Sequence, residues 1–207
     1  MEVVLDVYKR PYDENNPVIC MDETPKQLIE ETRIPIAGRP SFNDKHDYEY
    51  KRNGVSNIFI ASEPLKGKRY AQITEKKKKG DFANFLNSVI DLYPEAKKIT
   101  LVMDNYDTHT IGSFYEVYPP ERAKAIIDKL EIIYTPKHGS WLNMAEIELN
   151  ILQSQCLNRR IPDIITLDKE VTAWVLARNS KECRINWQFT VADSIIKLKR
   201  LYPTNYS

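Results

Sequence analysis

The chain has 207 residues, 42% of them hydrophobic, which is enough for one domain with a full core. The 30 basic and 29 acidic residues give a net charge of +1, which excludes the strongly basic balance of a protein that simply coats DNA. The sequence has no apolar stretch near the roughly 20 residues of a membrane helix and no signal-peptide layout at its start, so we expect a soluble, cytoplasmic protein without a membrane partner.

The first part of the chain has the pattern of a linker followed by strands. Residues 1–17 combine a short helical pattern with prolines and asparagines, which indicates a linker leading into a domain. The apolar run 18–21 stops at Asp22 and predicts a strand buried on both faces. Turn-forming residues predict a loop or a ragged hairpin over 32–54. Two further strands are then predicted, over 57–61 and 69–74.

A helix and a second buried strand follow. Apolar residues over 82–93 recur at three- and four-residue spacing, which predicts a helix with Asp81 as its N-cap. The apolar run 99–103 predicts a strand that ends at Asp104. Two acidic residues therefore follow two buried strands.

The last part of the chain is mainly helical. Asn143 followed by Glu146 has the spacing of a capping box and marks the start of a helix over 142–157. The other elements predicted after the second buried strand are a helix over 119–130, a strand over 131–135, and helices near 164–179 and 190–200.

This order of elements predicts an α/β fold with a mixed sheet and helices on its faces. Asp22 and Asp104 would then lie at strand ends near the middle of the sheet, where sites are common. Carboxylates suit Mg²⁺, and Glu146 is the third candidate ligand. The spacing alone leaves another interpretation open, because aspartates at strand ends are common and a glutamate at a helix start often only complements the helix dipole.

Several segments resemble a known family. Three of them lie over 20–26, 101–109 and 135–146, and the last is long and rich in unusual residues. The closing stretches 186–190 and 197–203 are similar as well. All of them resemble the DDE transposases of bacterial insertion sequences in the mariner superfamily, the branch often called IS six-thirty.

The resemblance implies a ribonuclease H-like fold with a mixed five-stranded sheet and extra C-terminal helices. It implies Asp22, Asp104 and Glu146 as the catalytic residues and as the ligands of two Mg²⁺ or Mn²⁺ ions. It also implies cut-and-paste transposition at TA targets, with transposon ends and target DNA as partners. The expected division is a linker at 1–17, a catalytic core at 18–160 and a helical extension of the same domain at 161–207. We expect a homodimer, because two transposon ends must be brought together, and association with the nucleoid when the protein is bound to DNA.

Two departures from the family pattern bear on function. Members usually begin with helix-turn-helix domains, and this chain begins where those would have ended, so we expect a catalytic fragment, a split gene product or a domesticated protein. The 41 residues between Asp104 and Glu146 (146 − 104 − 1) are more than is usual, and residues 115–122 are interpreted as an insertion outside the core.

Some residues near the three acids have competing interpretations. We expect Glu23 to point away from Asp22 into a structural salt bridge, and Glu148 to face away from Glu146. The lysine run 76–79 is interpreted as a solvated turn rather than a phosphate contact.

Other residues are candidates for the surroundings of the metals or for DNA contacts. His109 either supports a metal ligand or orders its loop. Trp141 either stacks on a base or packs as a hydrophobic staple. The segment before Glu146 either meets a phosphate or forms an ordinary turn into the helix. The remaining candidates are Asn105, Lys137, His138, Ser140 and Asn143.

Three functions are therefore open. The first is an active nuclease and strand transferase. The second is a catalytically idle or domesticated fragment that acts as a DNA-binding or dimerisation module. The third is a structure-specific nuclease of the ribonuclease H type, which leaves the segment 135–146 unexplained. The three intact acidic residues favour the first.

Overall fold

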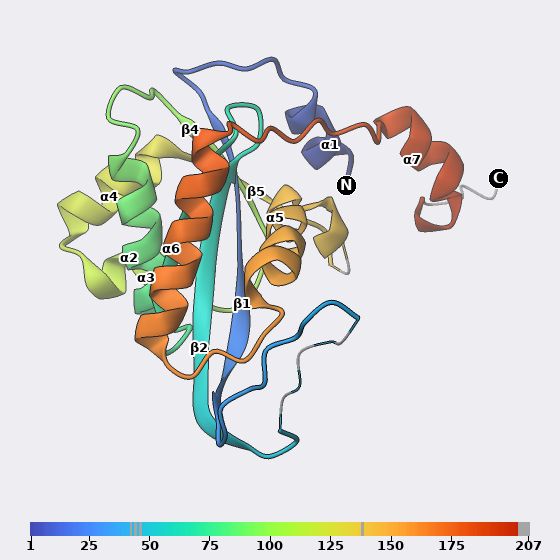
Figure 1. The fold of residues 1–207 in the computed structure, drawn as a ribbon. Helices are drawn as coiled ribbons and strands as arrows, with labels where there is room; N and C mark the ends of the chain where they lie inside the picture. Colours follow the sequence, from blue (N-terminus) through green and yellow to red (C-terminus); the bar gives the residue numbers. More distant parts are fainter. Residues whose placement is uncertain (42, 44, 46, 138, 203–207) are drawn as a thin grey trace.

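The structure, a computed structural model, describes residues 1–41, 43, 45, 47–137 and 139–202. These residues form one five-stranded sheet in the order β3-β2-β1-β4-β5 (Figure 1). The first three strands form an antiparallel meander, and β1, β4 and β5 run parallel to one another. The strands are β1 (Val18–Glu31), β2 (Tyr50–Glu63), β3 (Lys68–Thr74), β4 (Ile99–Met103) and β5 (Leu130–Tyr134). The predicted mixed five-stranded sheet is confirmed.

Helices cover both faces of this sheet (Figure 1). One face carries α2 (Lys79–Asp91), α3 (Gly112–Val117) and α4 (Pro120–Lys129). The other face carries α1 (Glu2–Tyr8), α5 (Met144–Leu152) and α6 (Ile164–Ser180). The remaining helical segments are a 3-10 turn at Ser140–Leu142, a π-helical turn at Gln153–Leu157, α7 (Val191–Lys197) and a 3-10 turn at Lys199–Leu201. Within the described residues, every helix is too short or too polar to cross a membrane.

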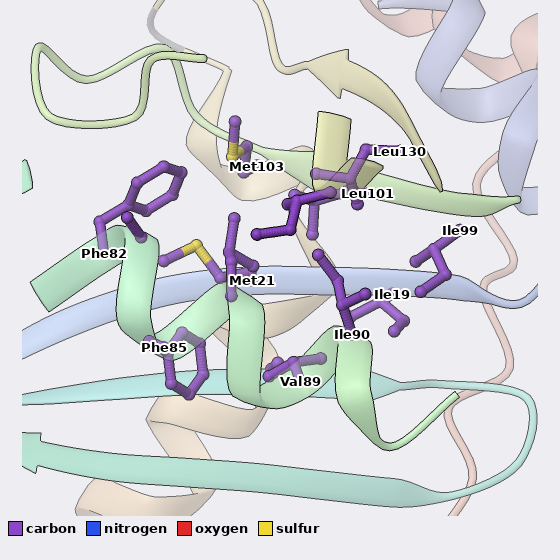
Figure 2. Close-up of a cluster of buried hydrophobic side chains, with 14 of the residues drawn as sticks. Ile19, Met21, Phe82, Phe85, Val89, Ile90, Ile99, Leu101, Met103 and Leu130 are labelled. Atoms are coloured by element: carbon purple, nitrogen blue, oxygen red, sulfur yellow. The ribbon is translucent and has the colours of Figure 1, made fainter. Parts of the chain in front are cut away.

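The core has two halves because side chains alternate along each strand. Ile19 and Met21 of β1 and Leu101 of β4 point toward α2, where they pack against its apolar stripe (Figure 2). Cys20, between Ile19 and Met21, and Val102, directly after Leu101, point to the opposite face, toward α5 and α6. Both β1 and β4 therefore contribute to both halves, as the continuous apolar runs predicted.

Helix α1 belongs to the second half of the core. We expected residues 1–17 to form a linker, and the helical pattern within them is indeed a helix. Its residues Val4, Leu5 and Val7 are all 1% exposed and pack in the same cluster as Cys20. The segment therefore contributes to the stability of the folded chain.

Strand β1 is longer than predicted. Asp22 does not end it, because the antiparallel pairing with β2 continues to the pair Glu31↔Tyr50. Only Val18 to Cys20 also pair with β4. Beyond that point the strand is held by main-chain hydrogen bonds to β2 rather than by burial, so the apolar run stops while the strand does not. For the same reason β2 begins at Tyr50, inside the segment 32–54 that was predicted as a loop or a ragged hairpin.

The start of α2 also differs from the prediction. The N-cap is Lys78, and Asp81 lies three residues inside the helix. The carboxylate of Asp81 accepts a hydrogen bond from the N–H of Lys78 at 2.8 Å. Asp81 therefore satisfies the helix start from within its first turn, which a sequence pattern does not distinguish from an N-cap.

Other predictions agree with the structure. The strands and helices expected after residue 94 are present, although their bounds differ by a few residues. Residues 115–122 form the end of α3 and the start of α4, and they lie mostly at the surface, between the buried residues Phe114 and Ala123.

The chain turns from β2 into β3 at Gly67, which has a φ of 72°. A Cβ there would lie 2.6 Å from the main-chain carbon of Glu182, so only glycine lets this turn lie against the segment after α6.

Candidate active site

Asp22 of β1 and Asp104, which directly follows β4, occupy equivalent positions relative to the paired part of the two strands. The last parallel pair of β1 and β4 is Cys20↔Val102, and each aspartate lies two residues beyond it. Neighbouring strands are about 4.8 Å apart, and residues two apart share a face. Asp22 therefore lies on the face of Cys20, where α5 packs.

Asn143 connects this face to the start of α5. Its Nδ2 donates to the carbonyl oxygen of Met21 at 2.8 Å and lies 3.3 Å from Oδ2 of Asp22. Its Oδ1 accepts from the N–H of Ala145 at 3.1 Å, which confirms the predicted cap. Asn143 is fully buried, so these contacts fix the first turn of α5 next to Asp22.

The predicted capping box is incomplete. The N–H of Asn143 donates to the carbonyl of Ser140 at 2.7 Å, so it does not bind the carboxylate of Glu146. Glu146 is half-buried in the first turn of α5. The carboxylate of Glu146 therefore does not cap the helix.

The charges of Asp104 and Glu146 act on Asp22. Burial raises the pKa of Asp22 to about 7, against an opposing hydrogen bond from the N–H of Glu23. The charges of Glu23, Asp104 and Glu146 raise this pKa further. A hydrogen bond with His109 lowers the pKa of Asp104, and the charge of Lys77 contributes to that lowering. Asp22 of β1 is therefore close to two other carboxylates, one at the end of β4 and one on α5.

The three acids do not form a closed metal cage. Among the described residues, no three His, Cys, Asp or Glu side chains are grouped closely enough to hold an ion as they lie. Asp104 is bound to His109, with 2.5 Å between Oδ1 and Nδ1. Asp22 accepts from the N–H of Glu23 at 2.8 Å.

His109 is fully buried beside Asp104. Its Nε2 lies 3.0 Å from Oε2 of Glu23, in an ion pair whose geometry is not that of a hydrogen bond. Its ring stacks on Phe82 with 4.8 Å between the ring centroids. Burial by itself would lower the pKa of His109, but the carboxylates of Asp104 and Glu23 outweigh burial and raise it to about 9. The two carboxyl groups on either side of the imidazole therefore favour its protonated form.

An open cleft of about 340 Å³ lies beside Asp104. It brings together several predicted residues, since Asn105, Lys137 and Ser140 line it together with Asp104. The aromatic rings of Tyr106 and Tyr134, both partly exposed, complete much of its wall. His138 lies outside the described residues. The cleft thus offers a carboxylate, a lysine and polar side chains at one edge of the sheet.

Comparison with known proteins identifies the family. The sequence profile described as DDE superfamily endonuclease matches residues 17–168, well over half of the chain. The chain belongs to this superfamily. No curated protein matches the sequence.

Solved structures agree on the fold of this DDE endonuclease. The "Crystal structure of the Mos1 mariner paired end complex with Mn" is similar with a TM-score of 0.60 and 15% identity, over 88% of this chain and 54% of that one. The "Mos1 transposase paired-end complex with left transposon end" gives 0.59 and 13%, over 88% and 55%. The "Crystal structure of the catalytic domain of Mos1 mariner transposase" gives 0.55 and 12%, over 88% and 82%. The ribonuclease H-like transposase fold is therefore confirmed, and the chain spans about half the length of the first two structures.

Lys77 of the DDE endonuclease lies near the site, although the sequence did not single it out. Lys77 belongs to the lysine run 76–79, which was interpreted as a solvated turn. Its Nζ lies 3.4 Å from Glu23 and 4.4 Å above the ring of Tyr106, and its charge reaches Asp104. A charge run gives no signal for which lysine folds back onto a buried carboxylate.

Glu148 of the DDE endonuclease faces away from Glu146, as expected, but its surroundings were not predicted. It is fully buried and accepts from Arg69 at 2.6 and 2.7 Å. Arg178 of α6 also donates to it, at 3.2 Å from both Nε and Nη2. The buried triad joins α5 to β3 and α6.

Two further expectations concern Glu23 and Trp141. The predicted structural salt bridge of Glu23 is confirmed, with Lys77 and His109 as its partners. Trp141 is 45% exposed and packs edge-on against Phe189 with 5.6 Å between the centroids. One side of the indole thus packs against the C-terminal segment while much of it faces solvent.

Proposed function

We propose that this chain is the catalytic domain of a DDE transposase that cleaves DNA strands and joins the 3′ ends to a target, with Asp22, Asp104 and Glu146 as its catalytic residues. The observation that carries the proposal is that Asp104, at the end of β4, and Glu146, in the first turn of α5, lie near enough to Asp22 of β1 for their charges to raise its pKa. Three acids so far apart in sequence have no structural need to lie near one another. Their negative charges make the ionised form of Asp22 costly, and a bound cation would remove that cost.

The residues fit hard divalent cations. Asp22, Asp104 and Glu146 offer oxygen ligands, and burial together with the neighbouring carboxylates raises the pKa of Asp22, so a cation there would stabilise its charged form. Two ions of Mg²⁺ or Mn²⁺, when bound, supply the positive charge that activates an attacking hydroxyl and stabilises the leaving oxygen. Binding them requires the three carboxylates to approach one another more closely than they lie here.

The cleft beside Asp104 is the proposed path of the DNA strand. Lys137 offers a positive charge for a phosphate, and Asn105 and Ser140 offer hydrogen bonds. His138 belongs to the same segment and is proposed as a contact on sequence grounds alone. Trp141 presents part of its indole to solvent and is proposed to stack on an unpaired base.

The finer assignments also rest on the family resemblance. We propose the IS six-thirty branch, cut-and-paste transposition with TA targets, and a homodimer that pairs two transposon ends. The similar Mos1 structures are described as paired-end and strand transfer complexes, which supports DNA as the partner. A cytoplasmic protein that is associated with the nucleoid, and the division at residues 17 and 160, remain proposals of the same kind.

The proposal is tested with supercoiled plasmid and Mn²⁺. We expect the protein to convert the plasmid to nicked circles, and we expect Asp104→Asn and addition of a chelator each to abolish this conversion. Asp128→Asn is the matched control, because it makes the same change on the exposed face of α4 and should nick as the wild type does. Equal nicking by the wild type and Asp104→Asn would reject these catalytic residues. Metal-dependent DNA binding without nicking would favour the idle or domesticated fragment.

A further inference from the structure

The carboxylate of Asp104 is held by a chain of contacts between side chains that come from three separate parts of the fold. His109 follows β4 and contacts Asp104 through Nδ1, at 2.5 Å from Oδ1. Glu23 of β1 contacts the opposite ring nitrogen, Nε2, at 3.0 Å. Lys77, from the segment between β3 and α2, lies 3.4 Å from the other oxygen of Glu23.

The two carboxylate-to-imidazole contacts differ from ordinary surface ion pairs because His109 and Glu23 are buried. The His109 side chain is fully buried and that of Glu23 is 6% exposed. An ionised glutamate so deeply buried is costly unless it has a charged partner, and His109 and Lys77 are the partners it has. Elsewhere on β1, Glu30 makes an ordinary exposed ion pair with Lys51.

The ring of His109 has little freedom to move. Phe82 covers one face in a stacked arrangement, with an angle of 27° between the ring planes. Tyr106 and the imidazole form an edge-on pair with 5.9 Å between the ring centroids. Because both ring nitrogens face carboxylates, a rotated ring would lose both contacts at once.

We propose that Glu23 and His109 act together as positioning residues for Asp104: Glu23 holds the imidazole, and the imidazole holds one oxygen of Asp104 so that the rest of this carboxylate is presented to a divalent cation. The inference rests on the proposed function and adds a role for Glu23, which lies on the opposite face of β1 from Asp22. The side chain of Asp104 is 34% exposed, so it remains open to the cleft while His109 holds it.

The expected effect is on metal affinity. Groups that orient a metal ligand typically change affinity or activity by about 10- to 100-fold when they are removed. We therefore expect His109→Asn to weaken Mn²⁺ binding by about that factor. Glu23→Gln keeps the shape of the side chain but removes its charge, so its effect should be smaller and still several-fold. The double variant should bind no more weakly than His109→Asn, because Glu23 acts through His109.

The experiment measures Mn²⁺ binding to the full chain by electron paramagnetic resonance of the free ion, with plasmid nicking and the melting temperature measured in parallel. Glu30→Gln is the matched control on the same strand and should bind as the wild type does. A role that is only structural would lower the melting temperature of Glu23→Gln and leave its Mn²⁺ affinity unchanged. If His109→Asn is unfolded at the assay temperature, Glu23→Gln carries the test by itself, because its imidazole remains.

The outcomes separate this inference from the proposed function. Wild-type binding that is lost in Asp104→Asn and weakened in Glu23→Gln supports both. Wild-type binding that is lost in Asp104→Asn but unchanged in Glu23→Gln and His109→Asn overturns the positioning role alone. If Asp104→Asn binds Mn²⁺ as the wild type does, the proposed function fails, and the positioning role fails with it.

Discussion

The side-chain amide of Asn143 donates to the carbonyl oxygen of Met21, at 2.8 Å, and so ties the first turn of α5 to the central strand β1. The two residues are 122 positions apart in sequence. Met21 immediately precedes Asp22, and Glu146 lies in the first turn of the helix. This contact, with the one that the same amide makes to Asp22, therefore holds Glu146 and Asp22 near each other.

Replacing Asn143 should destabilise the fold more than replacing an exposed cap. Asn143→Ala removes the cap of α5 and leaves buried polar groups unpaired, so we expect a loss of about 2 to 4 kcal/mol. Asp163 caps α6 in the same way, through the N–H of Thr166, but at the surface. Urea denaturation should show a clearly smaller loss for Asp163→Ala. Similar losses for the two variants would mean that the contact with Met21 contributes little.

Two glutamates on α5 should separate stability from activity. Glu148→Gln leaves the buried Arg69 and the partly buried Arg178 without their anion, and we expect a loss of about 3 to 5 kcal/mol. Glu146→Gln makes the same change two residues away, at a half-buried position, and should change stability little while abolishing nicking. The pair is compared by denaturant unfolding and by the plasmid assay. Normal nicking by Glu146→Gln would remove it from the catalytic residues.

The short helix α3 should be anchored by one side chain. Phe114 is fully buried and packs against the ring of Phe82, with 6.1 Å between the centroids. Phe114→Ala should therefore cost about 3 to 5 kcal/mol. The neighbouring Tyr115 is 48% exposed, so Tyr115→Ala should have little effect on the midpoint of thermal unfolding. A small effect of both substitutions would place α3 outside the cooperative core.

Stability should depend on pH through Glu63. Burial raises its pKa above the ordinary 4.5, although Lys66, Lys68 and a hydrogen bond from Tyr93 oppose the rise, and the charge of Glu14 adds to it. The folded state therefore binds this proton more tightly than the unfolded state does. As pH rises through this window, from 4.5 to the raised pKa, the folded protein loses stability.

Glu63→Gln removes this titration, so the variant should gain stability relative to the wild type as pH rises above 4.5. Glu131 provides a control of opposite sign, because hydrogen bonds from Arg10 and Thr100 lower its pKa. Glu131→Gln should thus lose stability relative to the wild type as pH rises from the lowered pKa to 4.5, and the difference should stay constant above that pH. Urea unfolding between about pH 3 and 8 tests both variants, and parallel curves for Glu63→Gln and the wild type would contradict the assignment.

The amino-acid sequence determined the elements whose signal is local. The three- and four-residue spacing from Phe82 to Tyr93 defines α2, because one apolar stripe needs no knowledge of its partner. The run Ile99–Met103 defines β4, since a strand buried on both faces is apolar throughout. The three acids followed from these boundaries together with the family resemblance.

Tertiary structure decided what depends on partners far away in the chain. The length of β1 beyond Asp22 depends on β2, because main-chain pairing extends a strand that burial no longer requires. The roles of Glu23 and Glu148 were equally hidden, since alternation gives the direction of a side chain and not what it meets. His109 and Arg69 supply those partners from positions 86 and 79 residues away. Such contacts form only when separate elements pack, because charges buried on folding must be paired by whichever groups the fold brings beside them.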